Sequence, residues 1–274
     1  MEKGYKIYRK KNLGYKLVEI PFFPQLLLKE KLEIVRDVYY YPKITSTMDV
    51  SKELIANNPK INYALVIAQT QTKSKGRLQR RWLSPCGGIW FSLILKPEIS
   101  SDKLFLLNYL FSLGVVNTLK DYGLDAKTKW PNDVLVGEKK ICGILIETDA
   151  EIDKVNWCIV GVGINVNIKE EYFEKHKLQA TSVFVELKKE VDLNEFLKKL
   201  FKNIDLLYKL MKLDYKQLIS LWCKNSSTLG RKVEIITLNK KIVGEAIGVS
   251  EDTGSLLLKT YNGKIESISS GDCV

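Results

Sequence analysis

The chain contains two apolar runs separated by a cationic loop, and this pattern limits the folds that it can adopt. Residues 63–68 and 89–95 are apolar enough to be buried strands. The polar loop between them, residues 71–82, carries three of the chain's six arginines, at positions 77, 80 and 81. Arginine suits bidentate recognition of phosphate or carboxylate. The pattern therefore predicts an anion site between two core strands, with a solvated basic hairpin loop as the alternative.

The bulk composition predicts a globular protein with room for one large core or two to three domains. The chain has 274 residues, of which 45% are hydrophobic and 27% charged. No segment approaches the roughly 18 consecutive apolar residues that a membrane span needs. The first residues contain no apolar signal-peptide core. We therefore expect a cytoplasmic protein without a membrane partner.

Cysteine and histidine usage excludes several kinds of chemistry. The five cysteines are widely spaced and include no Cys-x-x-Cys pair, which predicts reduced thiols and argues against a zinc site. The single histidine, His176, lies in a charged stretch and is expected at the surface. Histidine-dependent metal clusters and Ser-His-Asp catalysis need more histidine than this. A function must be built from lysine, arginine, asparagine, aspartate and backbone groups.

The net charge of +11 raises the question of a nucleic-acid partner. The lysines are scattered, and no block of five or more like charges occurs. A solvated lysine-rich surface is the favoured interpretation. We expect no sequence-specific DNA binding.

Periodicity and breakers predict the elements of the larger part of the chain. Ser46 or Thr47 is positioned to cap a helix over residues 50–56. Two further long helices are predicted at 102–122 and 193–210, followed by a shorter one. The remaining elements are a short helix at 26–34 and strands at 14–20, 126–130, 134–136, 141–146 and 155–167. Glycines at 161 and 163 within the last strand suggest close approach of another backbone or of a ligand.

The texture of the chain changes after residue 229. Short strands are predicted at 233–237, 241–249, 255–260 and 264–269, joined by tight turns. These residues predict a separate small β-barrel.

Four polar motifs follow or begin predicted core strands. They are the loop at 71–82, Lys-Trp-Pro-Asn-Asp at 129–133, Lys-x-x-Gly-Ile-Leu-x-Glu at 140–147 and Gly-x-Gly-Ile-Asn at 161–165. Each alone has a plain structural explanation as a turn, a helix cap, a surface lysine or a small-residue packing site. Together and in this order, they resemble the motifs of biotin protein ligases over residues 42–274.

The resemblance implies both a fold and a division of the chain. It implies an α+β catalytic domain, with helices packed on a mixed sheet of the class II aminoacyl-tRNA synthetase type, and a small C-terminal SH3-like β-barrel. The implied domains are residues 43–227 and 228–274, after an N-terminal extension at 1–42. Two residues depart from the family pattern: Met48 stands where an asparagine is usual, and Ser74 replaces the first glycine of the loop. Ser74 therefore should not need positive φ.

The resemblance also implies a two-step reaction. Biotin's carboxylate attacks the α-phosphate of ATP, with Mg²⁺ shielding the leaving pyrophosphate, and the biotinyl-adenylate then acylates a lysine of a carboxylase's biotin carboxyl carrier domain. The implied catalytic residues are Arg77, Lys129 and Lys140. The implied biotin-binding residues are Ser46, Thr47, Met48, Gln71, Lys75, Gly76, Arg77, Lys140 and Gly143. The implied ATP- and adenylate-binding residues are Arg77, Arg80, Trp82, Lys129, Asn132, Asp133, Lys140 and Asn165. Trp82 would close over the ligand, and Asp133 would assist the Mg²⁺ that accompanies ATP.

Three alternatives remain at this point. A lipoate or octanoate ligase of the same superfamily would use the same adenylate logic, although the motif at 129–133 and the C-terminal barrel favour biotin. A DNA-binding, biotin-responsive repressor is suggested because residues 9–17 resemble the wing of a winged helix, but too few residues precede them for a recognition helix. A non-enzymatic scaffold would leave the arginines unexplained. The sequence leaves open whether the chain forms a homodimer.

Overall fold

A seven-stranded mixed sheet forms the centre of the molecule in a computed structural model, which describes residues 6–10, 14–19, 22–151, 154–237 and 240–274. The strands in spatial order are β3 (Asp37–Ile44), β4 (Ala64–Gln71), β5 (Ile89–Leu95), β9 (Val155–Ile164), β8 (Lys139–Ala150), β7 (Asp133–Val136) and β6 (Ala126–Lys129). Strands β3 and β4 are parallel, and the other neighbours are antiparallel. The predicted α+β class with a mixed sheet is confirmed.

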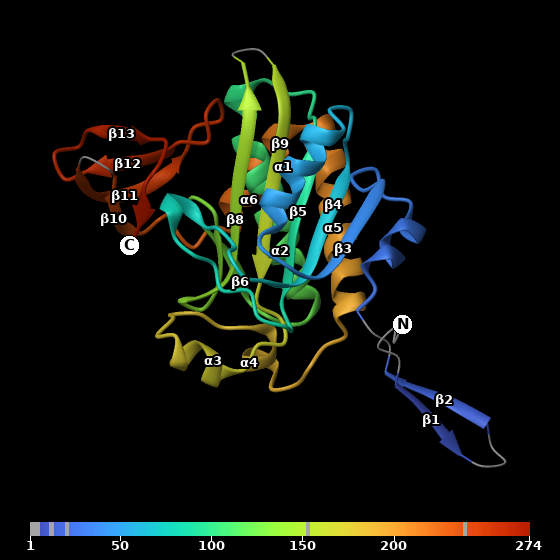
Figure 1. The fold of residues 1–274 in the computed structure, drawn as a ribbon. Coiled ribbons are helices and arrows are strands. Elements are labelled where there is room, and N and C mark those ends of the chain that lie inside the picture. Colours follow the sequence, from blue (N-terminus) through green and yellow to red (C-terminus); the bar gives the residue numbers. More distant parts are fainter. Residues whose placement is uncertain (1–5, 11–13, 20–21, 152–153, 238–239) are drawn as a thin grey trace.

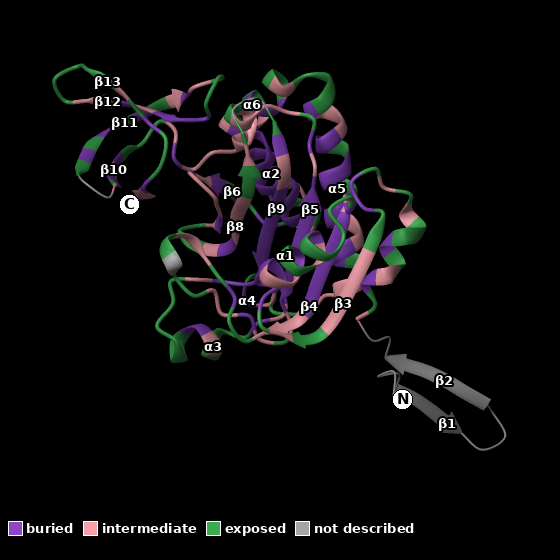
Figure 2. Ribbon diagram, turned by 45° about the horizontal axis from the view of Figure 1, so that its top comes forward, coloured by how far each residue is buried: buried purple, intermediate pink, exposed green. Residues whose placement is uncertain are grey.

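Helices cover both faces of this sheet. Helix α1 (Thr47–Asn57) packs on one face, and α2 (Phe105–Asp121), α5 (Leu193–Leu213) and α6 (Tyr215–Lys224) lie on the other (Figure 1). Along β4, Ala64 and Val66 join the apolar cluster under α1, whereas Leu65 and Ile67 join the larger cluster under α2 and α5. The first five residues of β4, 64–68, are therefore buried (Figure 2), which accounts for their continuous apolar sequence.

The predicted helices of the main domain are present with shifted ends. Ser46 caps α1, its hydroxyl accepting from the Met48 amide, as the sequence predicts. The helix predicted at 26–34 is instead a 3₁₀ helix, η1 (Pro24–Glu30), which ends where Lys31 adopts a left-handed conformation. The short helices α3 (Glu170–Lys175) and α4 (Val183–Leu187) were not predicted. Within the described part of the chain, no helix is both long and apolar enough to cross a membrane.

The main sheet includes residues that precede the predicted domain boundary. Strand β3 begins at Asp37 and crosses the boundary expected at residue 43. Strands β1 (Lys6–Lys10) and β2 (Gly14–Glu19) form an antiparallel hairpin, which Figure 1 shows away from the main sheet. The strand predicted at 14–20 is confirmed for residues 14–19, and residue 20 lies outside the described residues.

The C-terminal residues form a second, antiparallel sheet of five strands. Its spatial order is β13 (Ile265–Ile268), β12 (Leu256–Thr260), β11 (Lys241–Val249), β10 (Lys232–Ile236) and β14 (Asp272–Cys273). Strand β14, which was not predicted, pairs with β10 and brings the last residues back toward the larger domain.

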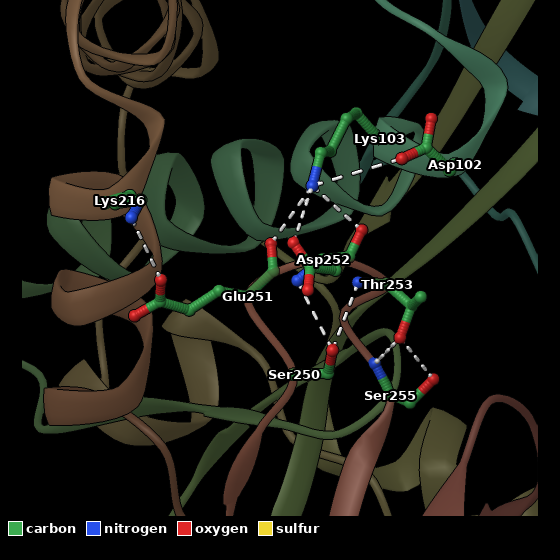
Figure 3. A network of polar contacts seen from close by, with 8 residues as sticks. All are labelled: Asp102, Lys103, Lys216, Ser250, Glu251, Asp252, Thr253 and Ser255. Carbon is green, nitrogen blue, oxygen red and sulfur yellow. Dashed lines mark hydrogen bonds and ion pairs between the residues drawn. The ribbon is translucent and has the colours of Figure 1, made fainter.

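The turn between β11 and β12 attaches this sheet to the start of α2 (Figure 3). The Lys103 ammonium donates to the carbonyls of Glu251 and Asp252, at 3.3 and 3.0 Å. Gly254 has φ +65°, and a Cβ there would lie 2.3 Å from the Phe105 ring. The turn therefore needs glycine both for its backbone conformation and for its close approach to α2.

Candidate active site

The strand registers bring the four sequence motifs together at one end of the main sheet, where several strands begin or end. Gln71, at the end of β4, pairs with Ile44, which lies two residues before Ser46, the N-cap of α1. Gly143 of β8 lies opposite both Gly163 of β9 and Asp133 of β7. The parallel strands β3 and β4 both end at this side of the sheet, and in the antiparallel pairs the end of one strand lies beside the start of its neighbour.

A cavity of about 500 Å³ opens at this end of the sheet. It is lined by every residue predicted for the site: Ser46, Thr47, Met48, Gln71, Lys75, Gly76, Arg77, Arg80, Trp82, Lys129, Asn132, Asp133, Lys140, Gly143 and Asn165. The structure therefore brings the predicted residues together, and their individual roles stay predictions. His176 is exposed and does not line the cavity.

Neutral hydrogen bonds order the end of the cavity beside α1, here called the α1 end. The Gln71 carbonyl oxygen accepts from the Thr47 amide at 2.8 Å and from the Thr47 hydroxyl at 3.1 Å. The Thr47 hydroxyl in turn accepts from Ser92 at 2.7 Å. These contacts join the first turn of α1 to β4 and β5.

The same chain of hydrogen bonds continues into the cationic loop. The Gln71 side-chain nitrogen donates to the Ser84 hydroxyl at 3.0 Å, and Ser84 donates to the Ser74 hydroxyl at 2.9 Å. Ser74 donates to the carbonyl of Trp82. We call the series Ser92, Thr47, Gln71, Ser84, Ser74 and the Trp82 carbonyl the Gln71 chain. Ser74 does not have positive φ, as predicted.

Cationic side chains occupy the rest of the cavity wall, here called the cationic end. The Lys140 ammonium lies 2.6 Å from a carboxylate oxygen of Asp133 and 5.2 Å from the centre of a Trp82 ring. Lys75 pairs with Asp49 of α1, and this hydrogen bond raises the pKa of Lys75. Lys75 of the loop and Lys140 of β8 therefore each form an ion pair with a carboxylate.

Two of the three loop arginines contact the C-terminal domain. Arg77 donates to the Asn132 side chain at 2.9 Å and to the Gly271 carbonyl at 3.1 Å. Arg80 pairs with Asp272. Burial lowers the pKa of the Arg77 guanidinium, and the nearby Asp272 and Asp133 charges oppose that shift. Strand β14 and the last residue, Val274, are therefore part of the cavity wall.

Side chains are the nearest protein groups to the two glycines of β9, Gly161 and Gly163. A Cβ at Gly161 would lie 2.6 Å from the Met48 sulfur, and one at Gly163 would lie 2.5 Å from the Trp82 indole nitrogen. The nearest groups are thus side chains and not another backbone, and the close approach of a ligand, the other alternative, stays a prediction. The Trp82 indole lies directly on the strands, and its buried nitrogen has no hydrogen-bond partner among the described residues.

Sequence patterns did not identify several residues of the wall. Asp272 contacts Arg80 across 192 positions, so no local pattern could connect them. Ser84 follows the loop without belonging to any of the four motifs. The segment around α3, including Tyr172, Leu178 and Gln179, also lines the cavity, and no site residue was predicted there.

Comparison with known proteins agrees with the motifs. The sequence model of the Biotin/lipoate A/B protein ligase family matches residues 40–165, and that of the Biotin protein ligase C terminal domain matches residues 228–274. The chain is 33% identical to the bifunctional ligase/repressor BirA of Bacillus subtilis, over 99% of this chain and 85% of BirA. It is also 33% identical to the biotin–[acetyl-CoA-carboxylase] ligase of Paracoccus denitrificans, over 38% of this chain and 44% of that protein.

A solved structure supports the same relationship. The biotin protein ligase from Aquifex aeolicus, in complex with biotin and ATP, superposes with a TM-score of 0.72 at 32% identity. The match covers 87% of this chain and 98% of the Aquifex chain.

Proposed function

Because the chain belongs to the biotin protein ligase family and is an ATP-dependent biotin ligase, we propose that it forms biotinyl-5′-AMP and transfers biotin to a lysine of a carrier domain. The supporting observation is the division of the cavity into a neutral α1 end and a cationic end. A ligand with an uncharged ring and a carboxylate, next to a triphosphate, matches that division.

The cations at the cationic end suit a reaction in which negative charge moves between oxygens. They are Lys75, Arg77, Arg80, Lys129 and Lys140. In the first step, a carboxylate oxygen of biotin attacks the α-phosphorus of ATP, and the bond to pyrophosphate breaks. No protein nucleophile is needed, so the protein contributes position and charge stabilisation. Lys140 would hold the carboxylate and α-phosphate oxygens, with Lys129 closer to the leaving group.

Substrate binding would require Lys140 to change partners. Its 2.6 Å contact with Asp133 neutralises the ammonium before a ligand arrives. A carboxylate or phosphate oxygen would replace Asp133, and Trp82 would leave its place over Gly143 to cover the ligand. In the second step, the acceptor amine attacks the carbonyl of the mixed anhydride, and AMP leaves with the electron pair of the broken bond.

The adenine end of ATP is assigned to Asn165. Its side-chain nitrogen donates to the Thr181 carbonyl at 3.0 Å. This leaves the amide oxygen of a largely buried residue to accept from an exocyclic amine, such as that of adenine. The amide is thus oriented before ATP binds.

Mg²⁺ would enter with ATP rather than occupy a protein cage. Within the described residues, no group of three potential metal-ligating side chains is present. Mg²⁺ is commonly held by substrate phosphates with one or two carboxylates, and Asp133, once released by Lys140, is the nearest candidate. The ion would supply shielding of the pyrophosphate charge.

The macromolecular substrate is a carrier domain of a biotin-dependent carboxylase. The Paracoccus relative's name specifies acetyl-CoA carboxylase as its target. We extend the class of target, a carrier-domain lysine, to this chain.

Pyrophosphate exchange with ATP tests the proposal. Biotin, lipoate and octanoate are compared in parallel with Mg-ATP, and biotin should support much faster exchange than the other two. Exchange at equal rates with lipoate would overturn the assignment of biotin as the substrate. Transfer is then tested with a purified carrier domain and its acceptor Lys→Arg variant, which should stay unlabelled.

A further inference from the structure

The Gln71 chain has a fixed direction because its two ends are chemically unambiguous. At one end, the Thr47 backbone N–H can only donate, so the Gln71 atom 2.8 Å away must be the amide oxygen. At the other end, the Trp82 carbonyl can only accept, so the Ser74 hydroxyl must donate to it. Every hydrogen between these points is therefore assigned: Gln71 donates to Ser84, and Ser84 donates to Ser74.

Burial makes this arrangement costly to break. Ser74 is 5% exposed and Ser84 is 4% exposed, so water has little access to either hydroxyl. Backbone hydrogen bonds reinforce these side-chain contacts. The Gln71 backbone N–H donates to the Ser84 carbonyl at 3.1 Å, and the Trp82 backbone N–H donates to the Ser74 carbonyl at 3.3 Å. The base of the cationic loop is thus tied to the end of β4 through both backbone and side chains.

The hydrogen bonds of the Gln71 chain determine which side-chain atoms of Gln71 are available to bind a ligand. Its amide oxygen already accepts two hydrogen bonds from Thr47, and one hydrogen of its nitrogen goes to Ser84. Among the described residues, no acceptor is found for the second hydrogen of that nitrogen, and Gln71 lines the cavity. Gln71 therefore presents a donor to the α1 end, which suits a carbonyl oxygen.

We propose that Ser84 and Ser74 are positioning residues that hold the Gln71 amide with its donor toward the ureido carbonyl of biotin. Neither serine needs to touch biotin. This inference rests on the proposed function, and it assigns a purpose to the serine that replaces the first glycine of the loop. Glycine at position 74 would leave the Ser84 hydroxyl without its acceptor, and Ser84 could then turn away from its present geometry.

The test compares the KM values for biotin and ATP in pyrophosphate exchange. Ser84→Ala should raise the KM for biotin about 3- to 10-fold, the range expected for one neutral hydrogen bond, and leave the KM for ATP within about twofold. Ser84→Thr, which keeps a hydroxyl, should recover most of the loss. Ser112→Ala is the control, because Ser112 is equally buried but lies on α2, on the opposite face of the sheet.

A double-mutant cycle tests whether Ser84 acts through Gln71. In a Gln71→Ala background, Ser84→Ala should change the KM for biotin by less than about twofold. Thermal unfolding checks that each variant folds. If Ser84→Ala does not fold, Ser74→Ala provides the same comparison from the other hydroxyl, with an expected rise of about two- to fivefold.

Three results would overturn the inference. They are an unchanged KM for biotin, an equal rise in the KM for ATP, and a full effect of Ser84→Ala in the Gln71→Ala background. Failure of the proposed function is distinguishable, because the wild-type protein would then show no biotin-dependent exchange at all.

Discussion

The two ends of the cavity satisfy their polar groups in different ways. At the α1 end, neutral groups hydrogen-bond in one continuous series through Thr47, Gln71 and Ser84. At the cationic end, Lys140, Arg80 and Lys75 each pair with a carboxylate of the protein. The first arrangement can remain as it is when a ligand binds. The second must exchange at least some partners, because phosphate oxygens compete for the same cations.

Each end of the cavity should therefore select its ligand by a different mechanism. A preformed neutral site discriminates by leaving its own groups unpaired when the ligand lacks the matching atom. In the cationic end, ion pairs with the protein's own carboxylates reduce the repulsion between neighbouring lysines and arginines, until a polyanion replaces those carboxylates. Substitutions at the α1 end should therefore affect mainly biotin binding, and substitutions at the cationic end mainly ATP binding and catalysis.

The largest effect is expected from Lys140→Gln. It removes the cation nearest the proposed carboxylate and α-phosphate oxygens, and pyrophosphate exchange should fall about 10²- to 10³-fold. Lys139→Gln is the matched control, one residue earlier on the same strand, and should retain the wild-type rate. A loss of less than about tenfold for Lys140→Gln would mean that this lysine serves mainly to neutralise Asp133.

Arg77→Gly should make the enzyme release biotinyl-adenylate. A hydrogen bond to a charged group contributes roughly 1.5–3 kcal/mol, which corresponds to adenylate held about ten- to a hundredfold less tightly. Most of that loss should appear in the off-rate. Adenylate formation could continue through Lys129 and Lys140, and the released anhydride would acylate lysines of bystander proteins.

Labelling of serum albumin measures that release. The Arg77→Gly variant is incubated with biotin, ATP and albumin, and biotin on albumin is detected by blotting. Leu78→Gly is the control for backbone freedom, because exposed Leu78 has φ +53° and carries no charge. Unlabelled albumin despite continued adenylate synthesis would show that another residue retains the intermediate.

The sequence predicted the shared edge of the site better than its internal contacts. Strand periodicity placed the motifs around Gln71, Lys129 and Gly163 at strand ends, and the antiparallel registers then required them to meet. The contact between Arg80 and Asp272 could not be predicted, because it depends on how the C-terminal sheet docks.

Short polar side chains were the other difficulty. Serine occurs in turns, caps and cores alike, so nothing in the sequence separates Ser84 from a loop serine. Its part in the Gln71 chain exists only because the loop returns to the end of β4. The same is true of Met48 and Trp82, whose positions over glycines depend on the packing of α1 and the loop against β9.

The two glycines of β9 allow a matched comparison of the ends. Gly161→Ala would meet the Met48 sulfur at the α1 end, and Gly163→Ala would meet the Trp82 indole at the cationic end. Overpacking typically costs about 1–3 kcal/mol, and both side chains can move, so we expect changes near the lower limit, about five- to tenfold. Gly161→Ala should raise mainly the KM for biotin, and Gly163→Ala mainly the KM for ATP. Equal changes in both KM values for either variant would show that the ends are not separate.

The smallest effect concerns pH and belongs to the Lys75–Asp49 pair. The hydrogen bond to Asp49 raises the pKa of Lys75 above its ordinary value of 10.5. For a group whose folded pKa is raised, the stabilising contribution is complete below the unfolded pKa and is lost as the pH rises through the folded pKa. Lys75 should therefore stay charged, and the KM for ATP should be level from about pH 7.5 to 9.5.

Replacing the Asp49 carboxylate should lower the pH at which the KM for ATP begins to rise. In Asp49→Asn, the pKa of Lys75 falls toward its ordinary value, so the rise in the KM for ATP should begin at lower pH than in the wild-type protein. The pair is partly exposed, and its effect at pH 9.5 should be about twofold or less. Biotinol, which keeps the ureido ring but has no carboxylate, should bind with the same affinity across this range, because the α1 end has no titrating group in the Gln71 chain. A tenfold rise in the wild-type KM for ATP before pH 9.5 would contradict the raised pKa of Lys75, and a parallel loss of biotinol binding would contradict the separation of the two ends.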